Sequence, residues 1–207
     1  MFFKACVFNG LLCCILLLSC AAGWEKNVTR NGIPFKKLRQ SANKESFTGY
    51  IDNDITVNGN HCRKGWIRFY KDWSLKSFVT VKDIILSGNH IPSGTWIEFD
   101  REGSMKLCAF PENTKIQGYL CKGTRGSPMG FHTSFHNNGA LHYFFPIGKI
   151  RIDGIPCKGG FFHNVSLYPD GRLKTCTLSE NTEIKGVLYK KGTALEFDEE
   201  SQLKRYK

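Results

Sequence analysis

Residues 94–118, GTWIEFDREGSMKLCAFPENTKIQG, contain the pattern that decides the fold. In this stretch, Phe99, Met105 and Gly118 are separated by intervals of 6 and 13 residues. Three other units keep both intervals and a truncated unit keeps the first: Phe69, Leu75, Gly88; Phe135, Leu141, Gly154; Leu167, Leu173, Gly186; and Phe197, Leu203. A fixed period of about 30 residues is typical of tandem structural repeats.

The first segment of each unit alternates apolar and polar residues. Ile97 and Phe99 flank Glu98, which is the pattern of a strand with one buried face. The turn Arg101-Glu102-Gly103 follows, and glycine at its end accepts the positive φ of a three-residue hairpin loop. The sequence therefore predicts a β-hairpin in each unit.

The return segment changes its apolar parity. Met105 is followed by Lys106, after which the apolar positions are Cys108 and Phe110. A parity change inside a strand predicts a β-bulge. A third short strand is expected around Ile116, just before the glycine that closes the unit.

These signals predict an all-β fold of tandem units with about three short strands each, over residues 47–207. Because the turns are hairpin turns, we expect an antiparallel meander; a parallel β-solenoid would also give equivalent residues at a fixed period. The connection from Gly118 to Gly130 is longer than the others. It is either a tolerated surface insertion or a functional loop.

The N-terminus has the features of an export signal. After Lys4 no charged residue occurs until Glu25, and the run Leu11 to Leu18 is apolar. A transmembrane helix needs about 20 apolar residues, which is longer than this run. We therefore expect removal of the segment and not a membrane-spanning helix.

The residues Leu17-Leu18-Ser19-Cys20 resemble the lipobox of bacterial lipoprotein precursors. The resemblance implies a signal peptide at 1–19, lipidation of Cys20, and a lipid-anchored protein at the cell membrane or outer membrane. Residues 20–46 would then form the lipidated N-terminus and a polar tether. The alternative is an ordinary secretory signal cut after Ala22, which would leave a secreted protein.

The charge balance favours anionic partners. The chain has 29 Lys and Arg against 18 Asp and Glu, a net charge of +11, and the basic residues are dispersed along the repeats. Beyond the membrane itself, we expect an anionic glycan, a lipid or a protein as partner, and no nucleic acid.

Five cysteines follow Cys20, at equivalent places in the units: Cys62, Cys108, Cys121, Cys157 and Cys176. Disulfides are permitted in exported proteins, and stacked units would bring equivalent positions together. Cys121 with Cys157 is the best candidate pair. Apolar residues replace cysteine in other units, so buried free thiols are the alternative.

Aromatic and cationic residues are interleaved in the first two units. Aromatic rings beside cations on a β face can stack on sugar rings or bases. The candidate ligand-stacking residues are Trp66, Arg68, Tyr70, Trp73 and Trp96. The alternative is a hydrophobic flank that a neighbouring strand covers.

Catalytic and metal signatures are weak. The chain has no CxxC, HExxH or Gly-x-Ser-x-Gly sequence, so we assign no catalytic residue, no metal and no cofactor. Four histidines, His132, His136, His142 and His163, fall in adjacent units without a carboxylate. The acidic groups at Asp100 with Glu102 and at Asp198–Glu200 lie in predicted turns.

The combination of Phe99, the turn glycine Gly103 and Met105-Lys106 resembles MORN-type and related bacterial β-hairpin repeats. This resemblance implies a binding or scaffolding surface. We therefore predict a membrane-anchored envelope lipoprotein whose β-repeat surface is non-catalytic and serves binding or structure. The alternative is a secreted glycan-binding module or an enzyme acting on envelope or host polymers.

Overall fold

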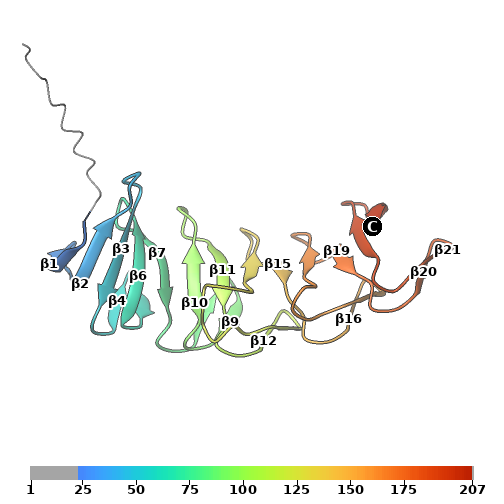
Figure 1. Ribbon diagram of the computed structural model, residues 1–207, viewed down its shortest axis with the longest axis horizontal. Helices are drawn as coiled ribbons and strands as arrows, with labels where there is room; N and C mark the ends of the chain where they lie inside the picture. Colours follow the sequence, from blue (N-terminus) through green and yellow to red (C-terminus); the bar gives the residue numbers. More distant parts are fainter. Residues whose placement is uncertain (1–22, 207) are drawn as a thin grey trace, which may run out of the picture.

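A computed structural model describes residues 23–206, and this part of the chain contains strands and connections but no helix. Thirteen strands form one sheet in the order β1-β2-β3-β6-β7-β10-β11-β14-β15-β18-β19-β22-β23. Figure 1 shows these strands side by side along the long axis of the molecule. The predicted all-β antiparallel meander is confirmed, because every neighbouring pair is antiparallel, unlike the coils of a parallel solenoid.

The sheet strands are β1 (Glu25–Arg30), β2 (Ile33–Gln40), β3 (Ser46–Ile51), β6 (Gly65–Tyr70), β7 (Leu75–Val79), β10 (Trp96–Phe99), β11 (Met105–Ala109), β14 (Thr133–Phe135), β15 (Leu141–Phe144), β18 (Val165–Leu167), β19 (Leu173–Thr177), β22 (Ala194–Phe197) and β23 (Leu203–Tyr206). Five separate two-stranded hairpins connect pairs of sheet strands. They are β4 (Ile55–Val57) with β5 (Asn60–Cys62), β8 (Ile84–Leu86) with β9 (Asn89–Ile91), β12 (Thr114–Ile116) with β13 (Tyr119–Cys121), β16 (Ile150–Ile152) with β17 (Ile155–Cys157), and β20 (Thr182–Ile184) with β21 (Val187–Tyr189).

Each unit therefore has four strands, one more than the sequence pattern indicates. The additional strand follows the unit glycine, in a segment that reads as a plain connection. At Asn58-Gly59 both central residues have positive φ, 48° and 78°, which is the geometry of a two-residue type I′ hairpin turn. The same turn occurs at Ser87-Gly88, Gln117-Gly118, Asp153-Gly154 and Lys185-Gly186. The recurring glycine thus marks a hairpin turn.

A β-bulge occurs at the same place in five hairpins of the sheet. Between β10 and β11, Glu98 pairs with Leu107 and Phe99 with Met105, so Lys106 is the extra residue. The parity change in the sequence comes from this bulge, as predicted. The extra residues in the five hairpins are Lys76, Lys106, His142, Lys174 and Lys204.

The core lies between the sheet and the small hairpins. Phe69, Phe99 and Phe135 on the sheet belong to the same buried cluster as Ile91, Ile116 and Ile152 on the small hairpins. Isolated bridges from Cys62 to Thr80, from Cys121 to Pro146 and from Cys157 to Leu178 tie small hairpins to the chain just after β7, β15 and β19. The five markers, Phe69, Phe99, Phe135, Leu167 and Phe197, are all buried in this cluster. Equal spacing in the sequence therefore corresponds to equal places in the fold.

The expected polar tether over residues 20–46 is wrong from residue 25 onward. β1 and β2 pair with each other, and β2 pairs with β3, so this segment belongs to the sheet. Phe35 and Leu38 are buried, although they are three residues apart and do not alternate as strand residues usually do. The missed signal is Asn31-Gly32, a dipeptide that favours a type I′ turn. The predicted signal peptide at 1–19 and Cys20 lie outside the described residues.

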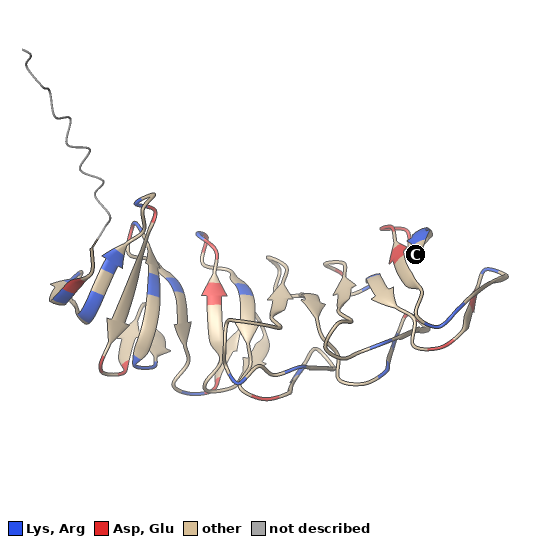
Figure 2. Ribbon diagram, viewed as in Figure 1, with Lys and Arg blue, Asp and Glu red and all other residues tan. Residues whose placement is uncertain are grey.

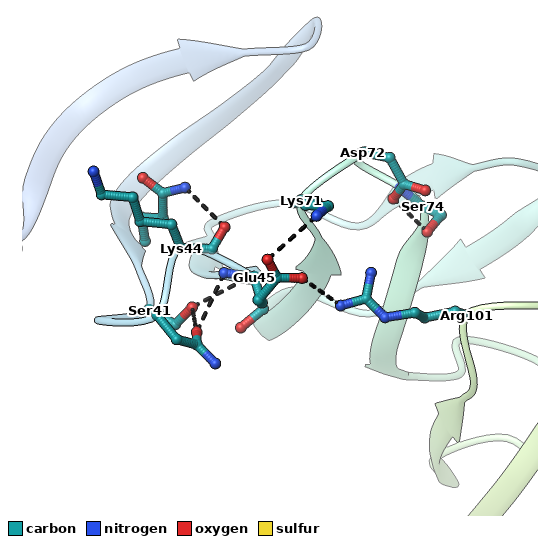
Figure 3. A network of polar contacts seen from close by, with 10 residues as sticks. Ser41, Lys44, Glu45, Lys71, Asp72, Ser74 and Arg101 are labelled. Atoms are coloured by element: carbon teal, nitrogen blue, oxygen red, sulfur yellow. Dashed lines mark hydrogen bonds and ion pairs between the residues drawn. The ribbon is translucent and has the colours of Figure 1, made fainter.

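The turns of three hairpins are linked by ion pairs around Glu45 (Figure 3). The Glu45 carboxylate accepts hydrogen bonds from the Arg101 guanidinium at 2.6 Å and from the Lys71 ammonium at 3.2 Å. These contacts, with Arg101 the stronger, lower the pKa of Glu45 below its ordinary value of 4.5. The side chains are solvent-exposed, so the expected contribution to stability is small.

We expect Glu45→Gln to lower the Tm slightly at neutral pH. Because the folded pKa lies below 4.5, the stabilisation is present above that pH and is lost as the pH falls through the folded value. Thermal unfolding from pH 7 down to pH 3 should therefore show wild type and variant converging in acid. A difference that persists unchanged in acid would contradict the ion-pair explanation.

We expect Phe69→Ala to lower the free energy of unfolding by about 3–5 kcal/mol, because it removes a fully buried aromatic ring from the shared core. Urea unfolding followed by circular dichroism measures the change. Phe162→Ala is the matched control, since this side chain is solvent-exposed and its loss should cost less than about 0.5 kcal/mol. Equal losses in both variants would argue against the core described above.

Candidate functional site

Aromatic side chains form a row across the solvent-facing side of the sheet. Tyr50 on β3 is registered opposite Trp66 on β6, and Trp96 on β10 is opposite Val79 on β7. Arg68 pairs with Ser77, which places Trp66 level with Val79 across the antiparallel pair β6–β7. The residues after the two tryptophans, Ile67 and Ile97, point into the core. Trp66 and Trp96 therefore point away from the core.

The rings in this row form two groups of contacting side chains. The centroids of Trp66 and Tyr50 are 5.2 Å apart with nearly perpendicular planes, and those of Trp66 and Trp24 are 5.4 Å apart. Trp66 remains 52% exposed. Farther along the sheet, the centroids of Trp96 and His132 are 6.1 Å apart. We call these five residues, Trp24, Tyr50, Trp66, Trp96 and His132, the aromatic row.

Cations accompany the aromatic row. The Arg39 guanidinium lies 4.7 Å from the centroid of the Trp24 ring, a cation–π contact. Arg68 is exposed on β6, two residues from Trp66. Figure 2 shows basic residues on strands toward both ends of the sheet and in the connecting segments, whereas the central strands β14, β15 and β18 contain no Lys or Arg. Cationic groups therefore lie within reach of a ligand on the aromatic row.

The bulge residues add a basic stripe. Because the bulge interrupts the alternation, Lys106 points out of the core although Met105 and Cys108 are buried. Lys106 is partly neutralised by Asp100 at 3.4 Å, and Lys204 by Glu196 at 3.9 Å. The basic stripe consists of Lys76, Lys106, His142, Lys174 and Lys204.

His142 is the one titratable imidazole in this stripe. Burial lowers its pKa, and the nearby His136, Lys174 and Lys106 lower it further. The ring centroids of His136 and His142 are 4.4 Å apart. Nε2 of His136 is 3.0 Å from the Leu167 carbonyl oxygen. His142 is therefore expected to be neutral at pH 7 and to gain charge only in acid. Within residues 23–206, no three His, Cys, Asp or Glu side chains are placed to hold a metal.

The structure separates the five residues predicted to stack on a ligand. Trp66, Arg68 and Trp96 share the open face. The hydroxyl of Tyr70 donates a hydrogen bond of 2.8 Å to the Phe99 carbonyl oxygen, and burial raises the pKa of Tyr70. Trp73 stacks on Phe47 at 4.4 Å and packs against the core. Its backbone φ of 65° at the turn redirects the side chain in a way that strand alternation does not predict.

Three members of the aromatic row were missing from the sequence prediction. Tyr50 could have been found, because it follows the alternation of β3 and pairs with Trp66. Trp24 lay in the segment assigned to the tether, and His132 lay in the long connection after Gly118. Their proximity to the tryptophans depends on strand order, which the sequence alone did not provide.

The expected disulfide between Cys121 and Cys157 is absent, and the five cysteines within residues 23–206 are free and buried. Each unit adds two strands to the sheet, so successive units are displaced by about 9.6 Å. Equivalent cysteines in neighbouring units are therefore farther apart than the Cα–Cα distance that a disulfide spans. The thiol beside Cys157 is that of Cys176, and this contact together with burial raises the pKa of Cys157. Burial also raises the pKa of Cys62 and of Cys121 to about 12. These thiols pack the core and are poor nucleophiles.

The acidic residues of the turns have local roles. Asp100 accepts a 2.8 Å hydrogen bond from the Ser104 amide, and Asp198 accepts one of 2.7 Å from the Gln202 amide. Both bonds close their own turns. Asp100 lies between β10 and β11, whereas Asp198 lies between β22 and β23, with four other strands between these two hairpins. The two acidic groups therefore do not converge on one site.

No family model, no curated protein and no solved structure matches this chain. No helix in residues 23–206 is long and apolar enough to cross a membrane.

Proposed function

We propose that this protein is an exported, membrane-anchored and non-catalytic binding protein, and that its ligand is an acidic glycan. The observation that carries the proposal is the alignment of Tyr50, Trp66 and Trp96 on one open face of the sheet. Aromatic rings offer flat apolar surfaces to the faces of sugar rings, and exposed cations attract carboxylate or sulfate groups. Trp66 is 52% exposed and Tyr50 and Trp96 are partly exposed, so all three rings are accessible to a ligand from solvent.

The spacing of the rings favours an extended ligand over a single sugar. Trp66 and Trp96 lie two strands apart, about 9.6 Å across the sheet. One monosaccharide cannot cover both rings, whereas a chain lying across the strands can contact both together. Simultaneous contacts of this kind raise the overall affinity without any deep pocket.

The proposed anchor is the lipid on Cys20. Four residues lie between Cys20 and Glu25, the first residue of β1, so the five steps of chain span at most about 18 Å. A lipidated Cys20 would therefore hold the sheet close to the bilayer, without the long tether expected from the sequence. A secreted glycan-binding module remains the alternative and differs only in the anchor. The enzymatic alternative receives no support from the separated acidic turns.

We expect Trp66→Ala and Trp96→Ala each to weaken binding to an acidic glycan by about fivefold or more, since one stacked ring contributes about 1–3 kcal/mol. Affinity electrophoresis in heparin and in lipopolysaccharide gels measures the change. Ile85→Ala, which removes an exposed apolar side chain outside the aromatic row, is the control and should bind as wild type does. Unchanged retention after combined replacement of Trp66, Trp96 and Arg68 would refute the glycan site.

Cys20→Ala should abolish incorporation of a radiolabelled or clickable fatty acid in cells that express the full chain, because it removes the thiol to be acylated. Wild type and Cys14→Ala, a change at another cysteine of the export signal, should both incorporate the label. Label retained by Cys20→Ala would remove the lipid anchor from the proposal and favour the secreted alternative.

A further inference from the structure

Two insertions interrupt the otherwise regular repeat. The markers Phe69 and Phe99 are 30 residues apart, as are Leu167 and Phe197. The interval from Phe99 to Phe135 is 36 residues, and the interval from Phe135 to Leu167 is 32 residues. The extra residues fall in loop 122–132 and in loop 158–164, which lead into β14 and β18.

The two longer loops meet and build a phenylalanine patch. The ring of Phe131 in the first loop is centred 4.9 Å from that of Phe161 in the second and 4.7 Å from that of Phe145, the residue after β15. Phe162 has its ring centroid 6.5 Å from that of Phe161, and Met129 lies two residues before Phe131 in the first loop. The exposed fraction is 89% for Phe162, 56% for Phe161 and 87% for Met129. Exposed apolar groups gathered in this way are typical of interaction surfaces. We call Met129, Phe131, Phe161 and Phe162 the phenylalanine patch.

The loops that present the patch are held by backbone contacts. The amide of Lys122 donates to the Phe145 carbonyl at 2.9 Å, and the amide of Gly160 donates to the Pro146 carbonyl at 2.9 Å. Gly159 lies so close to the neighbouring chain that a Cβ atom there would sit 2.1 Å from the Gly148 carbonyl oxygen. The exposed side chains are thus presented on a fixed backbone, which lowers the entropic cost of binding.

The charge of the two loops is entirely positive. Lys122, Arg125 and Lys158 lie within them, and neither loop contains an aspartate or glutamate. The Lys122 ammonium lies 3.2 Å from the centroid of the Phe161 ring, so a cation is placed directly at the apolar surface. Apolar side chains flanked by lysine and arginine are the composition of segments that bind the interface of anionic bilayers.

We propose that the phenylalanine patch inserts into the headgroup region of an anionic lipid bilayer. Phe162, Phe161 and Met129 would enter the boundary between headgroups and acyl chains, while Lys122, Arg125 and Lys158 contact lipid phosphates. Phenylalanine and methionine offer no hydrogen-bond donor for sugar hydroxyls. Because the side chains of Phe162 and Met129 are almost fully exposed, they fit a deformable lipid interface better than a preformed pocket on a protein partner. This contact needs neither the glycan site nor the lipid on Cys20.

The test places an environment-sensitive nitrobenzoxadiazole label on Phe162→Cys in the mature exported protein. Selective labelling is feasible because the cysteines within residues 23–206 are buried. With vesicles of phosphatidylcholine and phosphatidylglycerol, the label should gain intensity and shift to the blue, and pure phosphatidylcholine should give a smaller response. The matched control is the same label on Ile85→Cys, which replaces a 74% exposed apolar residue on β8, outside the patch. Its emission should not change.

Two further variants test the chemistry of the contact. Lys122→Gln with Lys158→Gln should reduce the response of the Phe162 label to anionic vesicles and leave the smaller response to neutral vesicles unchanged. Phe161→Ser with Met129→Ser should weaken vesicle partitioning, read from the same label, by at least about tenfold.

Three results would overturn the proposal. One is a Phe162 label that does not respond to anionic vesicles. Another is an equal response from the labels at Phe162 and Ile85. The third is a Phe162 label that responds to soluble heparin or to a protein partner but not to vesicles, which would assign the patch to a different ligand.

Discussion

The strict alternation of side chains along a β-strand governs both the stability and the surface of this protein. Successive residues point to opposite faces, so burying Ile97 and Phe99 against the small hairpins places Trp96 and Glu98 on the other face, where both are partly exposed. A sheet with one apolar face needs a covering layer, which the five small hairpins supply. The opposite face carries the aromatic row. The shared core and the candidate binding face are therefore two consequences of one constraint.

Departures from the regular repeat, namely the β-bulges and the two loop insertions, provide candidate functional features. Four of the five bulges turn a lysine outward and the fifth turns His142 outward, and the two insertions create the phenylalanine patch. The aromatic row contains tryptophan, tyrosine and histidine, which combine flat rings with polar atoms, whereas the patch contains phenylalanine and methionine. This chemical difference motivates the two partners proposed above, a hydrated polymer on the row and a lipid interface at the patch.

The two edges of the sheet are protected against pairing with other chains. β1 has Glu25, Lys26 and Arg30, and its register with β2 is interrupted at Asn27, where φ is positive. β23, at the other edge, contains Lys204 and Arg205. Charged side chains and local irregularities oppose edge-to-edge association, the main hazard of a long open sheet. The repeat array can therefore present a long face without exposing a reactive edge.

The sequence alone determined the all-β class, the unit length, the hairpins and the bulge, because each depends on local spacing and on turn residues such as Gly103. It also identified Trp66, Arg68 and Trp96 as candidates on one face. Only the tertiary structure decided that residues 25–40 join the sheet, that Cys121 and Cys157 stay apart, and that loops 122–132 and 158–164 meet. Those outcomes depend on strand order and on the two-strand distance between units, which local spacing does not contain. Tyr70 and Trp73 lie outside the aromatic row for the same reason, since contacts between neighbouring hairpins orient their side chains.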